Sequence, residues 1–217
     1  MILRRVFREN VRIRAGSAEL DGVLSMPDEP FGVVLFSHAA GGDRSCARTQ
    51  FMARYLQEAG FGTLLIDLLT PEEDTGDAPR FNIRVLADRL GDLASWLRDR
   101  TGRRLGYYGT STGAAAAFVA AAERQGVAAI VSRGGRPDLS AAILADVDAP
   151  TLLIVGSEDE PVATLNRDAS ELLRVPWKLV VLPGTGARFE ESGALEEVAR
   201  HAADWFRTHL PERPLMP

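Results

Sequence analysis

Short apolar runs alternate with amphipathic stretches along most of this chain. Continuous apolar runs are typical of parallel strands buried on both faces, whereas apolar residues that recur every three or four positions predict helices. We predict strands at residues 32–37, 61–67, 105–108, 127–131, 151–155 and 178–182, and helices at residues 47–59, 83–97, 114–122, 162–173 and 193–210. This alternation predicts an α/β fold with a mainly parallel, twisted sheet of about eight strands, helices on both faces and no large cap.

Two segments depart from this pattern. Residues 5–14 and 18–26 alternate apolar and polar positions, which predicts an antiparallel pair of strands that turns near Gly16. Residues 68–82 are polar, and loops of this length in compact domains are usually functional or mobile. We therefore expect residues 68–82 either to line the mouth of a pocket or to form a mobile surface loop. No linker, repeat or low-complexity tract divides the chain, so we expect one domain over residues 1–217.

Composition narrows the class of protein. The chain has 217 residues with a formal net charge of −5, which argues against a nucleic-acid partner because phosphate binding needs a basic face. The single cysteine, Cys46, excludes an internal disulfide and fits a reducing compartment. The longest apolar run, residues 114–122, is about half of the roughly 20 residues that span a bilayer. The first residues lack the unbroken apolar stretch of a signal peptide, so we expect a cytoplasmic protein with no membrane partner.

The most informative motif is Gly109-Thr110-Ser111-Thr112-Gly113, which lies between an apolar run and an alanine-rich helical run. This is the G-x-S-x-G pattern of a nucleophile elbow, in which a strand turns sharply into a helix. The two glycines let strand and helix approach closely, and Ser111 would stand at the tip of the turn as the nucleophile. An oxyanion hole would then use the backbone N–H of Thr112 and, from the loop after the first buried strand, the N–H of Ala40.

An acidic loop follows the predicted strand at residues 151–155. It contains Glu158, Asp159 and Glu160, and it would reach the same edge of the sheet as the elbow because parallel strands end there together. A carboxylate in such a loop can orient the imidazole of a catalytic triad and stabilise its cation. Asp159 is the candidate for this role, and a solvated cluster of acidic side chains is the alternative.

With these features the chain resembles the α/β-hydrolases, and within them the dienelactone hydrolase-like branch. The resemblance covers nearly the whole chain and rests on His38–Gly41, Leu69–Glu73, the serine elbow, Ser132–Pro137, Gly156–Asp159 and Pro183–Glu191. It implies hydrolysis of a small-molecule ester or lactone without a metal or organic cofactor, and it gives Asp159 the role of the triad acid. The type members of this branch use a cysteine nucleophile, so Ser111 implies esterase-like chemistry.

The expected catalytic base is missing from this sequence. In the resembling family, the loop after the last strand reads roughly Pro-Gly-x-x-His-x-Phe, and Ala187 occupies the position of that histidine. Arg188 stays protonated near neutral pH, and Glu190 lies past the motif, so neither residue can replace it. We therefore predict a triad that consists of Ser111, Asp159 and a gap at Ala187.

Five other side chains have competing interpretations. His38 is the histidine at the catalytic end of the sheet, where it would pin the oxyanion loop, bind substrate or serve as a base, the first role being the commonest. His201 is expected on a solvated flank of its helix, and His209 near the frayed end of the chain. Arg133 would bind a substrate carboxylate or tie its glycine-rich loop together. Cys46 is expected to be an inert thiol.

Two hypotheses of function follow. In the first, the chain is a metal-independent serine hydrolase of small esters, lactones or related acyl substrates, and Ala187 is an engineered substitution that silences turnover. In the second, the alanine is natural and the protein is a non-catalytic module that binds a small molecule in the old pocket. Retention of the elbow together with Asp159 favours the first. The oligomeric state stays open, a homodimer being one option.

Overall fold

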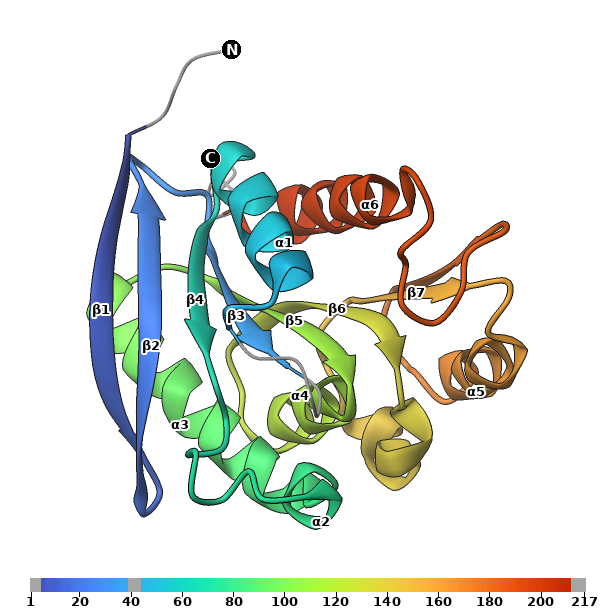
Figure 1. Cartoon of the computed structure of the whole chain (residues 1–217), viewed down its shortest axis with the longest axis horizontal. Helices are drawn as coiled ribbons and strands as arrows, with labels where there is room; N and C mark the ends of the chain where they lie inside the picture. The colour runs from blue at the N-terminus through green and yellow to red at the C-terminus, as the bar shows by residue number, and fades with distance from the viewer. Residues whose placement is uncertain (1–4, 39–43, 212–217) are drawn as a thin grey trace, which may run out of the picture.

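The computed structural model describes residues 5–38 and 44–211 (Figure 1). An eight-stranded sheet forms the centre of the molecule, in the order β1-β2-β4-β3-β5-β6-β7-β8. Its strands are β1 (Val6–Ala15), β2 (Ala18–Pro27), β3 (Val33–Ser37), β4 (Gly62–Ile66), β5 (Leu105–Ser111), β6 (Val127–Gly135), β7 (Thr151–Gly156) and β8 (Trp177–Leu182). The β1–β2 and β2–β4 pairs are antiparallel and the others parallel, so the prediction of a mainly parallel sheet of about eight strands is confirmed.

Helices cover both faces of this sheet (Figure 1). They are α1 (Ala47–Glu58), α2 (Asp77–Arg80), α3 (Ile83–Thr101), α4 (Thr112–Glu123), α5 (Glu160–Ser170) and α6 (Ala194–His209), with a 3-10 helix, η1 (Pro137–Asp146). Helices α1 and α6 enclose one apolar layer against the sheet, and α3, α4 and η1 enclose the other. Among the described residues, no helix combines the length and the apolar character needed to cross a bilayer.

Burial explains why the central strands read as unbroken apolar runs. Every residue of β3, β4 and β7 is buried, because helices pack on both sides of these parallel strands. Strand β8 lies at the edge of the sheet and exposes Trp177 and Val181. The apolar pattern therefore located the buried central strands of the sheet.

Several boundaries differ from the predictions. Strand β6 continues to Gly135, whereas the sequence suggested an end at Val131. Its polar end still forms ladder pairs, because Arg133 lies between Thr110 of β5 and Ile154 of β7. The polar stretch at residues 68–82 contains the one-turn helix α2, and α5 begins at Glu160, two residues earlier than expected. Apolar periodicity misses such segments because backbone pairing and capping form them.

An ion pair fixes the first half of the 68–82 segment. The guanidinium of Arg89, which is only 5% exposed, donates to both carboxylate oxygens of Glu73 at 2.6 and 2.7 Å and to the Leu68 carbonyl at 2.7 Å. The Thr70 backbone N–H donates to the same carboxylate at 3.0 Å. These bonds, with that from Arg89 the largest cause, lower the pKa of Glu73 to about 2 from its usual 4.5. The segment is thereby tied to α3.

This ion pair predicts a loss of stability in acid. Because the folded-state pKa of Glu73 is depressed, its contribution is complete above about pH 4.5 and disappears as pH falls towards 2. The loss should be about 1 kcal/mol, since the Glu73 side chain is 38% exposed and solvent screens the pair. Urea unfolding between pH 2 and pH 6 should therefore show a shallower acid slope for Glu73→Gln than for the parent, while Glu72→Gln, an exposed neighbour, keeps the parent slope. Equal slopes in all three proteins would contradict the assignment.

Candidate active site

Ser111 has the backbone conformation of a nucleophile elbow. It ends β5 and directly precedes α4, with φ of 48° and ψ of −124°. Only Glu29 and Phe189 share a positive φ with it among the described non-glycine residues. Such a conformation costs on the order of 1–3 kcal/mol and persists only where the surrounding structure enforces it. The strand therefore turns into the helix at Ser111 without an intervening loop.

Two glycines make this turn sterically possible. A Cβ on Gly113 would lie 2.4 Å from the carbonyl oxygen of Ser37, and one on Gly109 would lie 2.6 Å from the Cα of Ala114. The buried hydroxyl of Ser37 also donates to the Gly113 carbonyl at 2.7 Å. These contacts hold the first turn of α4 against the end of β3. The glycines of the motif thus act through backbone contact, as the sequence predicted.

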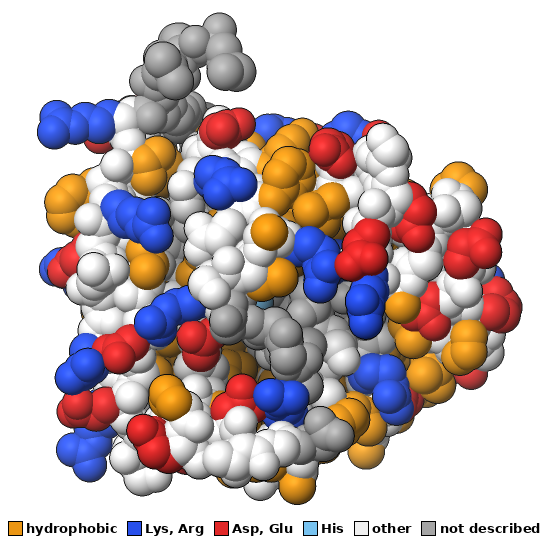
Figure 2. All heavy atoms as spheres, in the orientation of Figure 1, with side chains coloured by type: hydrophobic (Ala, Val, Ile, Leu, Met, Phe, Trp, Pro, Cys, Tyr) orange, Lys and Arg blue, Asp and Glu red, His pale blue; other side chains and the backbone are white. Residues whose placement is uncertain are grey.

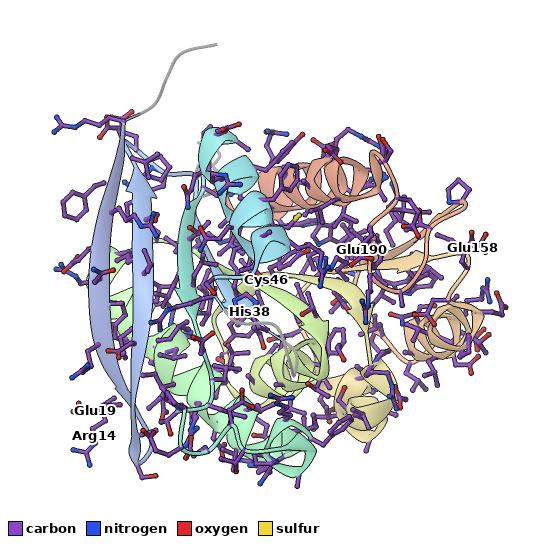
Figure 3. The ribbon with its side chains drawn as sticks, viewed as in Figure 1. Arg14, Glu19, His38, Cys46, Glu158 and Glu190 are labelled. Atoms are coloured by element: carbon purple, nitrogen blue, oxygen red, sulfur yellow. The ribbon has the colours of Figure 1, made fainter. Side chains whose placement is uncertain are left out.

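The oxyanion side of the site is described in part. Thr112 is buried in the first turn of α4, where the backbone N–H groups have no partner within the helix. Ala40, the other predicted donor, lies outside the described residues. His38 is half-buried at the end of β3, below α1 in Figure 3, and its ring lies 5.9 Å from that of Phe36.

The acid loop and the loop that carries position 187 are joined by backbone bonds. The Glu158 N–H donates to the Thr185 carbonyl at 2.9 Å, and the Gly184 N–H donates to the Ser157 hydroxyl at 2.9 Å. A Cβ on Gly156 would lie 2.1 Å from the Thr185 oxygen, so this contact needs a glycine. The two loops that the triad requires therefore lie side by side.

Exposure separates the three acidic residues of that loop. Glu158 is exposed and points away from the body of the protein in Figure 3. Glu160 is exposed and pairs with Arg167 at 3.1 Å on the surface of α5. Asp159, half-buried, precedes the first turn of α5. Asp159 is thus the least exposed of the three acidic residues, and its role as the triad acid stays a prediction.

The loop that carries Ala187 is ordered by groups other than a histidine. The Gly186 N–H donates to a carboxylate oxygen of Glu191 at 2.9 Å, and hydrogen bonds from backbone N–H groups lower the pKa of Glu191. Glu190 pairs with Arg48 of α1 at 2.9 Å. Ala187 itself is exposed, and its carbonyl lies 3.8 Å from where a Cβ on Gly134 would stand. Position 187 therefore borders the end of β6, next to the Gly135–Ser111 pair.

Arg133, near the carboxyl end of β6, is unusual because two of its guanidinium nitrogens are buried without a hydrogen-bond partner in the described part of the chain. Its Nε and Nη1 atoms are buried and have no hydrogen-bond partner among the described residues. Its guanidinium carbon lies 5.3 Å from the centre of the Phe189 ring, a cation–π distance. By contrast, the nearby Arg136 guanidinium is saturated by both carboxylate oxygens of Asp138 at 2.8 and 2.7 Å.

Tyr108 and Phe189 were not singled out from the sequence, and both adjoin Arg133. Tyr108 is 2% exposed, its hydroxyl has no hydrogen-bond partner among the described residues, and burial raises its pKa, an effect that the Arg133 charge partly offsets. Phe189 is also 2% exposed. Period-two alternation in β5 places Tyr108 and Thr110 on one face, and this signal would have identified Tyr108.

Among the other histidines and Cys46, it is His201 that differs from expectation. The side chain of His201 is only 19% exposed, and burial lowers its pKa, so the prediction of a solvated flank is wrong; α6 packs more of its circumference than the apolar stripe indicated. The ring of His209 lies 4.4 Å from that of Trp205, at the end of α6. Cys46 is half-buried at the start of α1.

Charges of both signs are mixed on the face shown in Figure 2, in keeping with surface pairs such as Arg48–Glu190.

No group of three or more His, Cys, Asp or Glu side chains in the described part of the chain is arranged to hold a metal ion. The described groups at this end of the sheet include the hydroxyl of Ser111, the backbone N–H groups of α4, the carboxylate of Asp159 and the guanidinium of Arg133.

Comparison with known proteins identifies the family. The model of the "Dienelactone hydrolase family" matches residues 20–209. The chain belongs to the dienelactone hydrolase family. The crystal structure of a dienelactone hydrolase from Anabaena variabilis is 46% identical, with a TM-score of 0.91 over 94% of this chain and 99% of that one. Membership of this family points to hydrolase chemistry.

Two further relatives are informative because the first is a longer protein and the second has low sequence identity to this chain. A Mycobacterium tuberculosis protein described as a putative phosphoribosyl transferase is 48% identical over 93% of this chain, but over only 46% of its own length. The chain thus spans about half the length of the curated relatives it matches. A serine hydrolase homologue from Coxiella burnetii has a TM-score of 0.77 over 90% of this chain and 96% of that one, at 20% identity, which supports the fold alone.

The positive φ of Ser111 predicts an unusual pair of mutants. Ser111→Gly relieves the strained conformation, whereas Ser111→Ala keeps a Cβ and hence the strain. We expect Ser111→Gly to be more stable than Ser111→Ala by about 1 kcal/mol, after the entropic cost of glycine is subtracted. Urea unfolding of both variants at neutral pH measures the difference. A less stable glycine variant would show that the turn is not strained.

Proposed function

We propose that this chain is a serine hydrolase of small esters, lactones or related acyl substrates whose catalytic base is absent. In the complete reaction Ser111 would give its proton to a base and attack the acyl carbon, the bond to the alcohol oxygen would break and that oxygen would take the proton, and water would then hydrolyse the acyl-serine to release the acid. The N–H groups of Thr112 and Ala40 would stabilise the oxyanion of each step. Asp159 would orient the imidazole of a base at position 187. The strained backbone of Ser111 is the observation that carries this proposal, because a positive φ at a serine between a strand and a helix, flanked by Gly109 and Gly113, is the conformation of a nucleophile elbow.

Turnover of the chain as it stands should be very low. Removing the base from a serine triad costs on the order of a millionfold in kcat, and the oxyanion hole with substrate binding retains roughly 10³–10⁴ over water. In the proposal Ser111 is therefore a correctly placed hydroxyl near its ordinary reactivity. The family does not require a metal or organic cofactor for the proposed reaction.

The mycobacterial description does not change this assignment. Phosphoribosyl transfer is attributed to a protein about twice as long, and the shared half is the part that matches the dienelactone hydrolase family. We therefore assign acyl-group hydrolysis, rather than phosphoribosyl transfer, to the segment described by this structure.

A non-catalytic binding protein is the second candidate, and Ala187 is the observation that favours it. The loop around position 187 is held by Glu191, Glu190 and the acid loop, so its shape does not depend on a histidine. A pocket of this kind can bind an acyl compound without cleaving it. The two candidates differ in whether a supplied base restores chemistry.

Restoring the base is the decisive experiment. Because the loop is already ordered, Ala187→His should raise kcat/KM for a short-chain aryl ester by several orders of magnitude. Ser111→Ala in the same background should remove the gain, which separates triad chemistry from solvent hydrolysis. Added imidazole should also partly rescue the parent chain. A folded Ala187→His protein with no gain would reject the triad and favour the binding protein.

We further propose that Arg133 binds a carboxylate on the substrate. Its two buried N–H groups lack partners in the described part of the chain, and a carboxylate accepts two such bonds at once. In the Ala187→His background, Arg133→Gln should lower kcat/KM about 10- to 100-fold for a carboxylate-bearing ester and much less for its neutral methyl ester. Arg136→Gln, which breaks only the pair with Asp138, should not discriminate between the two substrates. Equal losses on both substrates would indicate a structural role for Arg133.

A further inference from the structure

A hollow lined by three arginines, here called the basic hollow, lies at the amino ends of β5 and β6, at the opposite end of the sheet from Ser111. It has a volume of about 430 Å³ and is bordered by the end of α3 and the starts of β5 and β6. Arg98, Arg103 and Arg104 line it together with Gly102 and Gly126. Ser111 lies at the carboxyl end of β5, whereas Arg104 immediately precedes its amino end. The hollow is thus separate from the candidate active site.

The guanidinium of Arg98 is held in place at this hollow. Its Nη1 donates to the Gln125 carbonyl at 2.5 Å, and its Nη2 donates to the Ser95 hydroxyl at 3.3 Å. Gly126 has φ of 101°, and a Cβ there would lie 2.1 Å from Nη1 of Arg98. A glycine at position 126 therefore leaves room for the guanidinium of Arg98 at the side of the hollow. A charge fixed in this way loses little conformational entropy when a ligand binds.

Among the described residues, none of these three arginines forms an ion pair with a carboxylate. Within the described ranges, no Asp or Glu oxygen lies within 4.0 Å of the guanidinium nitrogens of Arg98, Arg103 or Arg104. Arg104 donates to the Pro211 carbonyl at 3.1 Å, and Arg103 is exposed. The carboxyl end of α3 favours a cation at Arg98, but Arg103 and Arg104 lie beyond its cap at Gly102. Three arginines without an ion pair in the described part of the chain thus line one hollow, although the net charge of the chain is −5.

A second hollow of about 210 Å³ adjoins the first and shares Arg103 and Arg104 with it. Pro30 and Phe31 line this part, and Phe31 is 41% exposed. Glu29 is its acidic member. The two arginines thus lie between a cationic compartment and one with an apolar wall. A ligand with an anionic head and an organic body matches this arrangement.

We propose that this basic hollow binds a small phosphate-bearing molecule. A phosphate carries up to two charges and three free oxygens, which suits several converging guanidinium groups better than the single charge of a carboxylate. Arg98 supplies a pre-positioned cation. Arg103 and Arg104, which line both hollows, bind the phosphate from the other side. The organic part of the ligand lies against Phe31. This assignment does not rest on the proposed hydrolase activity.

Calorimetric titration with inorganic pyrophosphate at low ionic strength tests the proposal. We expect saturable binding of one pyrophosphate per chain, about tenfold weaker in Arg103→Gln/Arg104→Gln and weakened by added salt. Arg174→Gln is the matched control, because Arg174 is exposed and far along the chain, between α5 and β8. Arg133→Gln should bind as the parent does, which separates this hollow from the catalytic edge. Circular dichroism and urea unfolding confirm that each variant is folded.

Several results would overturn the proposal. Heats that do not saturate, or equal weakening in the double variant and in Arg174→Gln, would mean that only the general surface charge attracts pyrophosphate. Loss of binding in Arg133→Gln would place the anion at the catalytic edge instead. Sedimentation with phosphatidylglycerol vesicles, in the absence of saturable pyrophosphate binding, would assign the arginines to a lipid headgroup surface rather than to a soluble ligand.

Discussion

The steric constraint at Ser111 fixes how the carboxyl end of β5 is arranged against α4 and β3. Strand β5 passes into α4 through a single residue with a positive φ, and the chain on either side leaves no room for a Cβ at Gly109 or Gly113. Gly113 must contact the backbone of Ser37, and Gly109 must contact Ala114. These contacts fix the amino end of α4, which supplies N–H groups, relative to the end of β3. The strain is maintained because burial on both faces of the sheet prevents the turn from relaxing.

The two loops beyond β7 and β8 form a second unit whose shape is independent of the residue at 187. Backbone bonds from Glu158 to Thr185 and from Gly186 to the Glu191 carboxylate replace any contribution from an imidazole. Under the proposed function, these bonds hold the loops of a triad in place although position 187 is an alanine. Stability and chemistry are separable here, because the bonds that hold the loop use atoms that the reaction does not need.

Arg89 and Arg133 differ in whether the buried nitrogens of their guanidinium groups have hydrogen-bond partners among the described residues. Arg89 is saturated by Glu73 and the Leu68 carbonyl, so its charge serves to anchor the 68–82 segment. Arg133 lies against Phe189 with buried N–H groups that have no partner in the described part of the chain. Burying an uncompensated cation is costly, and such a cost is commonly repaid when a ligand binds. The sequence shows the same residue type in both positions and cannot distinguish them.

Apolar periodicity determined the order of strands and helices, and the elbow motif located Ser111, because both depend on neighbours in sequence. The absence of a histidine at 187 is likewise a property of the sequence alone. The extension of β6 through Arg133, the burial of His201 and the isolation of Asp159 from its exposed neighbours needed the tertiary structure. Each depends on which distant segment covers a side chain: the position of β7 beside β6 makes Arg133 part of the sheet. The spacing of apolar residues specified the helices and strands. The packing of distant segments decided which charged side chains have a hydrogen-bond partner, because such partners come from other parts of the chain.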